Sequence, residues 1–252
     1  MNPEHGQPIQ PIQQWRIENL TFAYPHCPPS IHNLSLTVQT GERIGIIGNN
    51  GAGKTTLFLL LAGILTPLSG SLFWNDTELQ PGSWRPHLGV LLQNPDDQLF
   101  ASSVQEDVGF GAANQGLRGH TLQERVREAL TLVGCENLAA RPPHHLSGGE
   151  KRLVALAGVL AMQPQIILYD EPSANLDCRS RRRLIPLIQD SCPTYLVASH
   201  DLELIREVCK RVILLDHGQI CADGSTDRIL GDPQLLARYD LECPGSLRGM
   251  TI

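Results

Sequence analysis

The stretch GNNGAGKTT, from Gly48 to Thr56, constrains the fold of this chain more than any other. It fits the pattern G-x-x-x-x-G-K-[ST] in full, with the apolar stretch RIGIIG running into it and LFLLLAGIL following it. Phosphate oxygens can approach backbone N–H groups only where side chains are absent, and Gly48, Gly51 and Gly53 provide that room. The pattern therefore predicts a phosphate-binding loop between a buried strand and a helix.

The polar residues of this loop have expected roles toward ATP and Mg²⁺. Lys54 brings a full positive charge to the β- and γ-phosphates, and Thr55 offers a hydroxyl to Mg²⁺. The helix that starts at Gly53 points its positive end at the phosphates. A glycine turn with a surface lysine is the alternative, which motif and context together disfavour. The residues expected to bind the nucleotide are Gly48, Asn49, Asn50, Gly51, Ala52, Gly53, Lys54, Thr55 and Thr56.

Far downstream, the stretch IILYDE is an apolar run that ends in a pair of acidic residues, Asp170 and Glu171. The run predicts a buried strand, so Asp170 emerges at the carboxyl end of a parallel sheet, where ligands bind in such folds. Asp170 is expected to hold Mg²⁺, and Glu171 to orient or polarise the attacking water. A solvated acidic turn is the alternative. Adenine is the expected base, because the guanine-reading motif NKxD does not occur.

Strand and helix patterns divide the chain. Alternation in NLSLTVQT predicts a half-buried strand, and strands and helices alternate again after residue 162, which indicates a parallel sheet covered by helices. Between about residues 97 and 162 the patterns are almost wholly helical and predict an inserted helical subdomain. We expect a flexible lead-in over 1–14, a single domain over 15–240 and a tail over 241–252.

Composition narrows the class of protein. The net charge is −6, from 20 basic and 26 acidic residues, so nucleic acid is not an expected partner. The seven cysteines lack the paired spacing of zinc sites, which favours free thiols in a reducing compartment. The longest apolar runs are shorter than the ~20 residues of a membrane-spanning helix.

A second anion site is indicated by LSGGEK. Ser147, Gly148 and Gly149 are expected to form the first turn of a long helix, with a hydroxyl, exposed amides and a helix dipole. One γ-phosphate cannot reach both sites if the helical subdomain stands away from the sheet.

Taken in their order along the chain, the motifs resemble those of the ATP-binding subunit of ABC transporters. The resemblance extends roughly from Trp15 to Leu230. The resemblance implies an α/β, P-loop ABC-type nucleotide-binding domain with a mainly parallel core sheet, an N-terminal antiparallel β subdomain and an inserted helical subdomain. It also implies roles for four further residues. Gln93 is the Q-loop glutamine, a Mg²⁺ ligand that also takes part in catalysis. His200 is the switch histidine, and Tyr24 stacks on adenine. Asp177, in SANLD, belongs to the D-loop.

The resemblance removes the conflict between the two anion sites. In that family two domains lie head to tail, so Ser147, Gly148 and Gly149 bind the nucleotide of the partner and Asp177 lies at the dimer interface. Asp177 as the N-cap of the next helix is the alternative, and both roles are compatible.

Other polar residues have plainer interpretations. A structural role for His200 is the alternative to a γ-phosphate contact. His144 and His145 are interpreted as structural and pointing different ways. Arg179, Arg181, Arg182 and Arg183 are interpreted as a solvated helix face.

The segment LLQNPDDQLFASSVQEDVGFGAANQGL resembles the Q-loop region of energy-coupling factor (ECF) ATPases of cobalt/nickel or vitamin uptake. The expected partners are a second ATP-binding subunit, identical or paralogous, a transmembrane scaffold and a substrate-binding membrane subunit. The loop after Gln93 would dock on the scaffold, with Phe100 in the contact. The expected location is the cytoplasmic face of the membrane, as a peripheral protein. Departures from the family pattern include Glu150, Leu153, Ser173 and Asn175; none removes a phosphate or Mg²⁺ ligand.

Other classes fit less well. The sequence of the Q-loop segment disfavours an ABC exporter or a general importer. A soluble ABC ATPase of chromosomes or ribosomes lacks support, because the chain has no sustained heptads and one nucleotide domain. LSGGE excludes other P-loop kinases and GTPases. The sequence does not identify the transported substrate.

Overall fold

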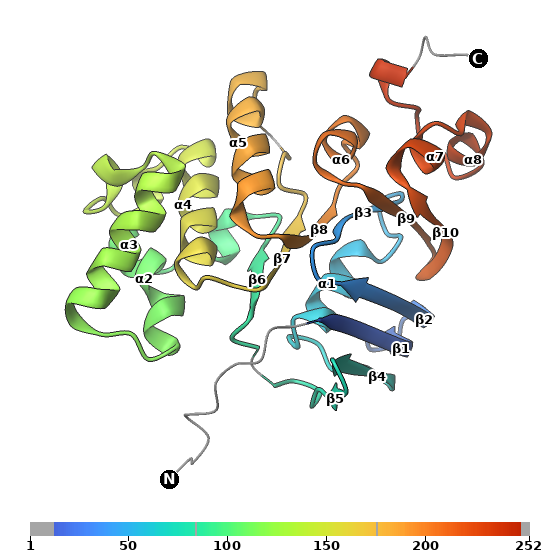
Figure 1. The fold of residues 1–252 in the computed structure, drawn as a ribbon, viewed down its shortest axis with the longest axis horizontal. Helices are drawn as coiled ribbons and strands as arrows, with labels where there is room; N and C mark the ends of the chain where they lie inside the picture. Colours follow the sequence, from blue (N-terminus) through green and yellow to red (C-terminus); the bar gives the residue numbers. More distant parts are fainter. Residues whose placement is uncertain (1–12, 84, 175, 248–252) are drawn as a thin grey trace.

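The computed structural model describes residues 13–247 except 84 and 175. Two sheets share one core with the helix that follows the phosphate loop (Figure 1). The first sheet is antiparallel, in the order β2-β1-β4-β5. Its strands are β1 (Gln14–Ala23), β2 (Pro29–Gln39), β4 (Ser69–Trp74) and β5 (Thr77–Glu78).

The second sheet is parallel except for one edge strand. Its order is β10-β9-β3-β8-β7-β6, and only β10 runs antiparallel to its neighbour β9. All five residues of β7 and of β8 are buried, because both faces of this sheet are covered. The strands are β3 (Arg43–Ile47), β6 (Leu88–Leu91), β7 (Ile166–Asp170), β8 (Thr194–Ala198), β9 (Arg211–Asp216) and β10 (Gln219–Ser225).

Helix α1 (Lys54–Leu61) lies in the core between the two sheets, and its apolar side chains fill it. In β2 the buried residues alternate with more exposed ones, at Leu34, Leu36 and Val38, as the period of two predicts. Helices on the other face of the parallel sheet form a second core. They include α5 (Cys178–Ser191), α6 (Leu202–Val208), α7 (Thr226–Leu230) and α8 (Pro233–Arg238).

Three helices stand to one side of the sheets, at the left of Figure 1. They are α2 (Val104–Asn114), α3 (Gly119–Val133) and α4 (Gly148–Ala161). Among the short 3₁₀ turns, η1 (Pro95–Asp97) lies between β6 and α2, and η2 (Glu136–Leu138) and η3 (Pro143–His145) lie between α3 and α4; a further turn is η4 (Gly245–Leu247). The predicted fold class, with a mainly parallel core sheet, an antiparallel sheet and an added group of helices, is confirmed.

The domain boundaries stay predictions. Residues 1–12 of the expected lead-in and 248–252 of the expected tail lie outside the described residues. The described part of the tail packs on the domain, since Ser246 donates to the Glu203 carboxylate from its N–H and its hydroxyl, at 2.9 and 2.6 Å.

Candidate functional site

The phosphate loop joins the end of β3 to the start of α1. Gly48 and Gly53 have positive φ angles of 146° and 105°, and a Cβ at either position would collide with the backbone of Leu215 or Ser30. Glycine is therefore required at both places for the chain to make this turn.

A hollow of about 590 Å³ opens over this loop. Several expected site residues from distant parts of the sequence border it together, among them Gln93, Glu171 and His200. Ser30 and Leu241 also border it, and nothing in their sequence context marked them. The full lining is Tyr24, Ser30, Gly48, Asn49, Asn50, Gly51, Gly53, Lys54, Thr55, Thr56, Gln93, Glu171, His200 and Leu241.

Lys54 is held by its own loop. Its Nζ donates to the carbonyl oxygens of Gly48 at 2.7 Å and Asn49 at 3.2 Å, and lies 3.9 Å from Glu171 Oε1. Burial lowers the pKa of Lys54, while the charges of Glu171 and Asp170 act in the opposite direction. The ammonium group thus has carbonyl and carboxylate partners that phosphate oxygens can replace.

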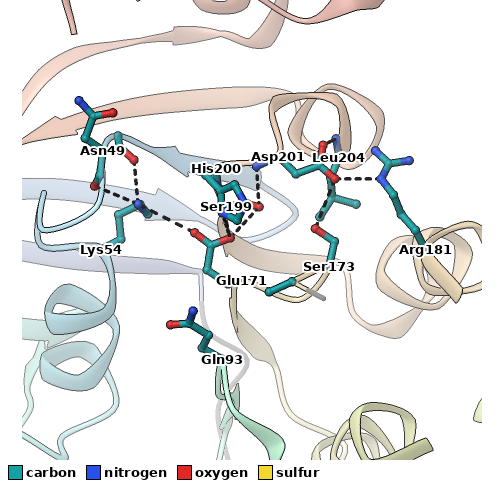
Figure 2. Close-up of polar contacts among 12 residues, drawn as sticks. Asn49, Lys54, Gln93, Glu171, Ser173, Arg181, Ser199, His200, Asp201 and Leu204 are labelled. Atoms are coloured by element: carbon teal, nitrogen blue, oxygen red, sulfur yellow. Dashed lines mark hydrogen bonds and ion pairs between the residues drawn. The ribbon is translucent and has the colours of Figure 1, made fainter. Parts of the chain in front are cut away.

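Glu171 forms the centre of a hydrogen-bond network (Figure 2). Its Oε2 accepts from the Ser199 hydroxyl at 3.1 Å and from the His200 N–H at 3.3 Å, and lies 2.8 Å from His200 Nδ1. The Glu171 side chain is only 7% exposed, whereas that of His200 is 65% exposed. The histidine ring can therefore leave Glu171 and turn toward a bound ligand without breaking the core.

Asp170 is buried at the end of β7, and its Oδ1 has no partner among the described residues. Burial raises its pKa, the charge of Glu171 adds to this, and a hydrogen bond from Thr55 opposes it. An unsatisfied carboxylate oxygen beside a hydroxyl suits a small cation with oxygen ligands. These residues fit Mg²⁺.

Tyr24 and Gln93 both border the hollow. The Tyr24 hydroxyl is 3.4 Å from Thr56 Oγ1, and its ring packs edge-on against Phe22, with centroids 5.0 Å apart. Tyr24 is 38% exposed, and Gln93, which follows β6, is also exposed. Both side chains are therefore accessible to a ligand in the hollow.

The signature residues do not border this hollow. Ser147 caps α4: its Oγ accepts from the Glu150 N–H, and the Glu150 carboxylate in turn accepts from the Ser147 N–H at 2.8 Å and is 2.7 Å from its hydroxyl. The hydrogen bonds from Ser147 lower the pKa of Glu150. Gly148 and Gly149 form the first turn. In a single chain the two predicted phosphate sites are thus separate.

Asp177 caps α5, because its Oδ1 accepts from the Ser180 N–H at 2.7 Å. The capping alternative is confirmed. Asp177 is also exposed, so its predicted place at an interface stays a prediction. Asn175 lies outside the described residues.

Two other predictions are wrong in part. Arg181 is not on a solvated face: it pairs with Asp201 and Glu207, both at 2.9 Å, since α6 packs beside α5. His144 and His145 do not point apart, because the 3₁₀ turn brings their ring centroids to 4.3 Å.

Sequence reasoning missed Ser199 and Arg152. Ser199 is fully buried and bonds Glu171; Arg152 is 4% exposed and contacts main-chain carbonyl oxygens around the site. A hydroxyl before His200 and a basic residue in LSGGEKR were the only signals.

Comparisons with known proteins agree with this geometry. A family profile described as "ABC transporter" matches residues 31–174. An ABC transporter ATP-binding protein of Synechocystis sp. is 50% identical over 233 residues, covering 92% of this chain and 82% of that protein. The energy-coupling factor transporter ATP-binding protein EcfA of Methanothermobacter thermautotrophicus is 40% identical over 236 residues, 90% of this chain and 76% of that protein.

A solved structure adds to these relatives. It is cbiO1 from Clostridium perfringens, described as part of the ABC transporter complex cbiONQ; the TM-score is 0.76, with 31% identity over 94% of this chain and 98% of that one. Across the described residues, no helix is both long and apolar enough to cross a membrane.

Proposed function

The chain belongs to the ABC transporter family as an ATP-binding, ATP-hydrolysing subunit, and we propose that it powers a membrane importer of the ECF type. The cargo class is a metal ion such as cobalt or nickel, or a vitamin. Similarity to EcfA and to cbiO1 supports this class.

The observation that carries the ECF proposal is an exposed aromatic pair beside the Q-loop. Phe100 and Phe110 are 66% and 49% exposed, and their rings meet edge to face with centroids 4.8 Å apart. Phe110 also borders an apolar hollow of about 500 Å³ between α2 and α3. Exposed aromatic rings at the edge of an apolar hollow are typical of a protein-binding surface. The transmembrane scaffold is the proposed occupant, with the chain peripheral at the cytoplasmic face and a substrate-binding membrane subunit completing the importer.

ATP lies in the hollow over the phosphate loop. The backbone from Gly48 to Thr56 and the Lys54 ammonium hold the phosphates, and Tyr24 stacks on the adenine. Thr55, Gln93 and Asp170 hold Mg²⁺, which neutralises charge on the β- and γ-phosphates. The unpartnered Oδ1 of Asp170 supports this ligand set.

Hydrolysis depends on Glu171. Its carboxylate orients and polarises the attacking water, and His200 contacts the γ-phosphate, with Gln93 as the third residue of the catalytic set. The contact between His200 and Glu171 in this structure supports a shared task, because one ring movement frees both groups.

A second ATP-binding subunit completes each site. Ser147, Gly148 and Gly149 face the partner's γ-phosphate, and Asp177 lies along the shared interface. Their absence from the lining of the hollow in one chain supports this arrangement.

Replacing both phenylalanines tests the importer proposal. The chain is co-expressed with the scaffold and substrate-binding subunits encoded in the same genome. Phe100→Asp with Phe110→Asp should abolish co-purification with the scaffold and ATP-driven uptake of labelled metal or vitamin, while the ATPase activity of the isolated chain stays normal. Leu132→Asp, at a residue 64% exposed on α3 that does not border the apolar hollow, is the control and should assemble normally. Normal assembly of the double variant would refute this docking surface.

A further inference from the structure

A buried arginine in the signature helix contacts three segments of the active site. Arg152 lies in α4, just past its first turn, and is 4% exposed. Burial lowers its pKa, and the charges of Asp170 and Glu171 oppose that effect. A guanidinium buried this deeply requires hydrogen-bond partners, because desolvating the charge is otherwise costly.

The partners of Arg152 are main-chain carbonyl oxygens. Its Nη2 donates to the carbonyl of Gln93 at 2.7 Å and to that of Ala174 at 3.5 Å, and its Nη1 donates to that of Glu171 at 3.3 Å. These carbonyls come from the segments after β6 and β7 and from the D-loop. Because the guanidinium is planar and rigid, it fixes the positions of all three segments relative to α4.

The carbonyl of Glu171 belongs to a residue with an uncommon backbone. Glu171 has a φ angle of 46°, in the left-handed region that non-glycine residues seldom adopt. Such a conformation persists only where its surroundings hold it. Here the Glu171 N–H donates to the Ala198 carbonyl at 2.8 Å, and the Glu171 carbonyl accepts from Arg152 at 3.3 Å and from the Ala174 N–H at 3.1 Å. Arg152 is therefore one of the contacts that hold the main chain from which the carboxylate projects.

The neighbouring residue strengthens the link to the Q-loop. Lys151 Nζ lies 2.6 Å from Asp96 Oδ1, in the turn η1 that follows Gln93. Adjacent residues of α4 thus contact this loop at two positions, Gln93 and Asp96. The lysine pair is partly exposed and contributes little alone, so Arg152 carries the contact.

We propose that Arg152 is a positioning residue for ATP hydrolysis: it fixes the main chain of Glu171 and Gln93 and so joins the signature helix to the γ-phosphate site. This inference rests on the proposed role of Glu171. It also gives a route by which movement of the Q-loop at the scaffold alters the catalytic carboxylate.

The test compares Arg152→Met and Arg152→Lys with Arg125→Met. Arg125, on α3, donates from its Nη1 to the Ala161 carbonyl at 3.1 Å. Ala161 is the last residue of α4, the helix that carries Arg152 near its start. Replacing Arg125 therefore removes an equivalent hydrogen bond away from the site. The kcat and KM for ATP, the Kd for a fluorescent ATP analogue and the Tm are measured for each purified chain.

Arg152→Met should lower kcat on the order of 10²-fold, because misplacing a reacting group costs about that much, with the Kd for the analogue within about twofold of the parent. Arg152→Lys keeps the charge but cannot bridge three carbonyls, so its kcat should lie between those of Arg152→Met and the parent. Arg125→Met should keep the parent kcat even if its Tm falls. Arg152→Lys carries the test if the methionine variant does not fold.

A double variant separates this inference from the proposed role of Glu171. Glu171→Gln alone should lose turnover, and adding Arg152→Met should lower that residual rate by much less than the roughly 10²-fold expected in the parent background, since Arg152 acts largely through Glu171. Normal turnover of Glu171→Gln would refute the role of Glu171. An inactive Glu171→Gln together with a parent-like kcat for the Arg152 variants, or a change in Kd alone, would refute the positioning role.

Discussion

Glu171 and Lys54 both have hydrogen-bond partners within the protein. The Glu171 carboxylate accepts from Ser199 and from the main chain of His200, and the Lys54 ammonium donates to Gly48 and Asn49. Phosphate oxygens that contact Lys54 would compete with these carbonyl partners. This favours polar ligands that offer several charged oxygens at once.

Replacing these two residues should separate binding from turnover. Glu171→Gln keeps the shape of the side chain and should leave the Kd for ATP unchanged, while turnover falls by about 10²–10⁴-fold because the base is lost. Lys54→Ala should raise the Kd for ATP itself. Isothermal titration and phosphate release measure the two quantities; turnover near the parent rate in a clean Glu171→Gln preparation would contradict the role.

Tyr24 offers a second residue-scale test. A base–aromatic stack is worth ~1–3 kcal/mol, so Tyr24→Ala should raise the Kd for ATP by roughly 10-fold or more. Tyr24→Phe loses only the contact with Thr56 and should bind ATP like the parent. If the alanine variant binds equally well, Tyr24 is a strand-end residue without a role in binding.

A residue could be assigned to the site from the sequence only where a motif contains it. Lys54, Glu171, Gln93 and His200 border one hollow, as their motifs indicated. Arg152 could not be predicted, because its partners are carbonyl groups, which every residue has, and only the fold shows which of them meet it. Whether these residues have the expected roles stays a prediction.

At the scale of elements, the strongly periodic segments were predictable and the weakly marked ones were not. The strands β6 and β10 have no strand pattern that marked them in the sequence. β6 has four residues, and β10, QICADGS, contains glycine, aspartate and serine, which favour turns. β10 is a strand because it pairs antiparallel with β9, and its own sequence does not indicate that pairing.

Two glycines show how closely these elements pack. A Cβ at Gly45 in β3 would lie 2.5 Å from Ile205 Cγ2 of α6, so Gly45→Ala should lower the free energy of unfolding by about 1–3 kcal/mol. A Cβ at Gly158 in α4 would lie 3.8 Å from the nearest atoms, an ordinary contact. Gly158→Ala should therefore raise the free energy of unfolding by about 0.5–1 kcal/mol through helix propensity. Urea unfolding measures both; equal effects would contradict the packing described.

At the scale of the whole molecule, the chain holds two predicted phosphate sites that it does not join. The phosphate loop joins β3 to α1, whereas Ser147 caps α4, and α4 belongs to the group of helices that stands to one side of the sheets (Figure 1). We infer that two chains are needed for a complete site, each supplying one half to the other. The sequence indicated both halves but could not give their separation, which depends on how the helical group packs.

Mixing two defective chains tests this inference most directly. Ser147→Arg places bulk and charge at the signature, and Lys54→Ala weakens the phosphate loop. Both are made in the Glu171→Gln background, so that ATP stays intact, and Tm measurements confirm that each chain is folded. Alone, each variant should remain monomeric with ATP and Mg²⁺ in light scattering, while Ser147→Arg still binds ATP. Mixed, they form one site with both defects and one intact site, so the ATP-dependent dimer should return. A Ser147→Arg chain that dimerises with ATP as well as its parent would contradict the two-chain site.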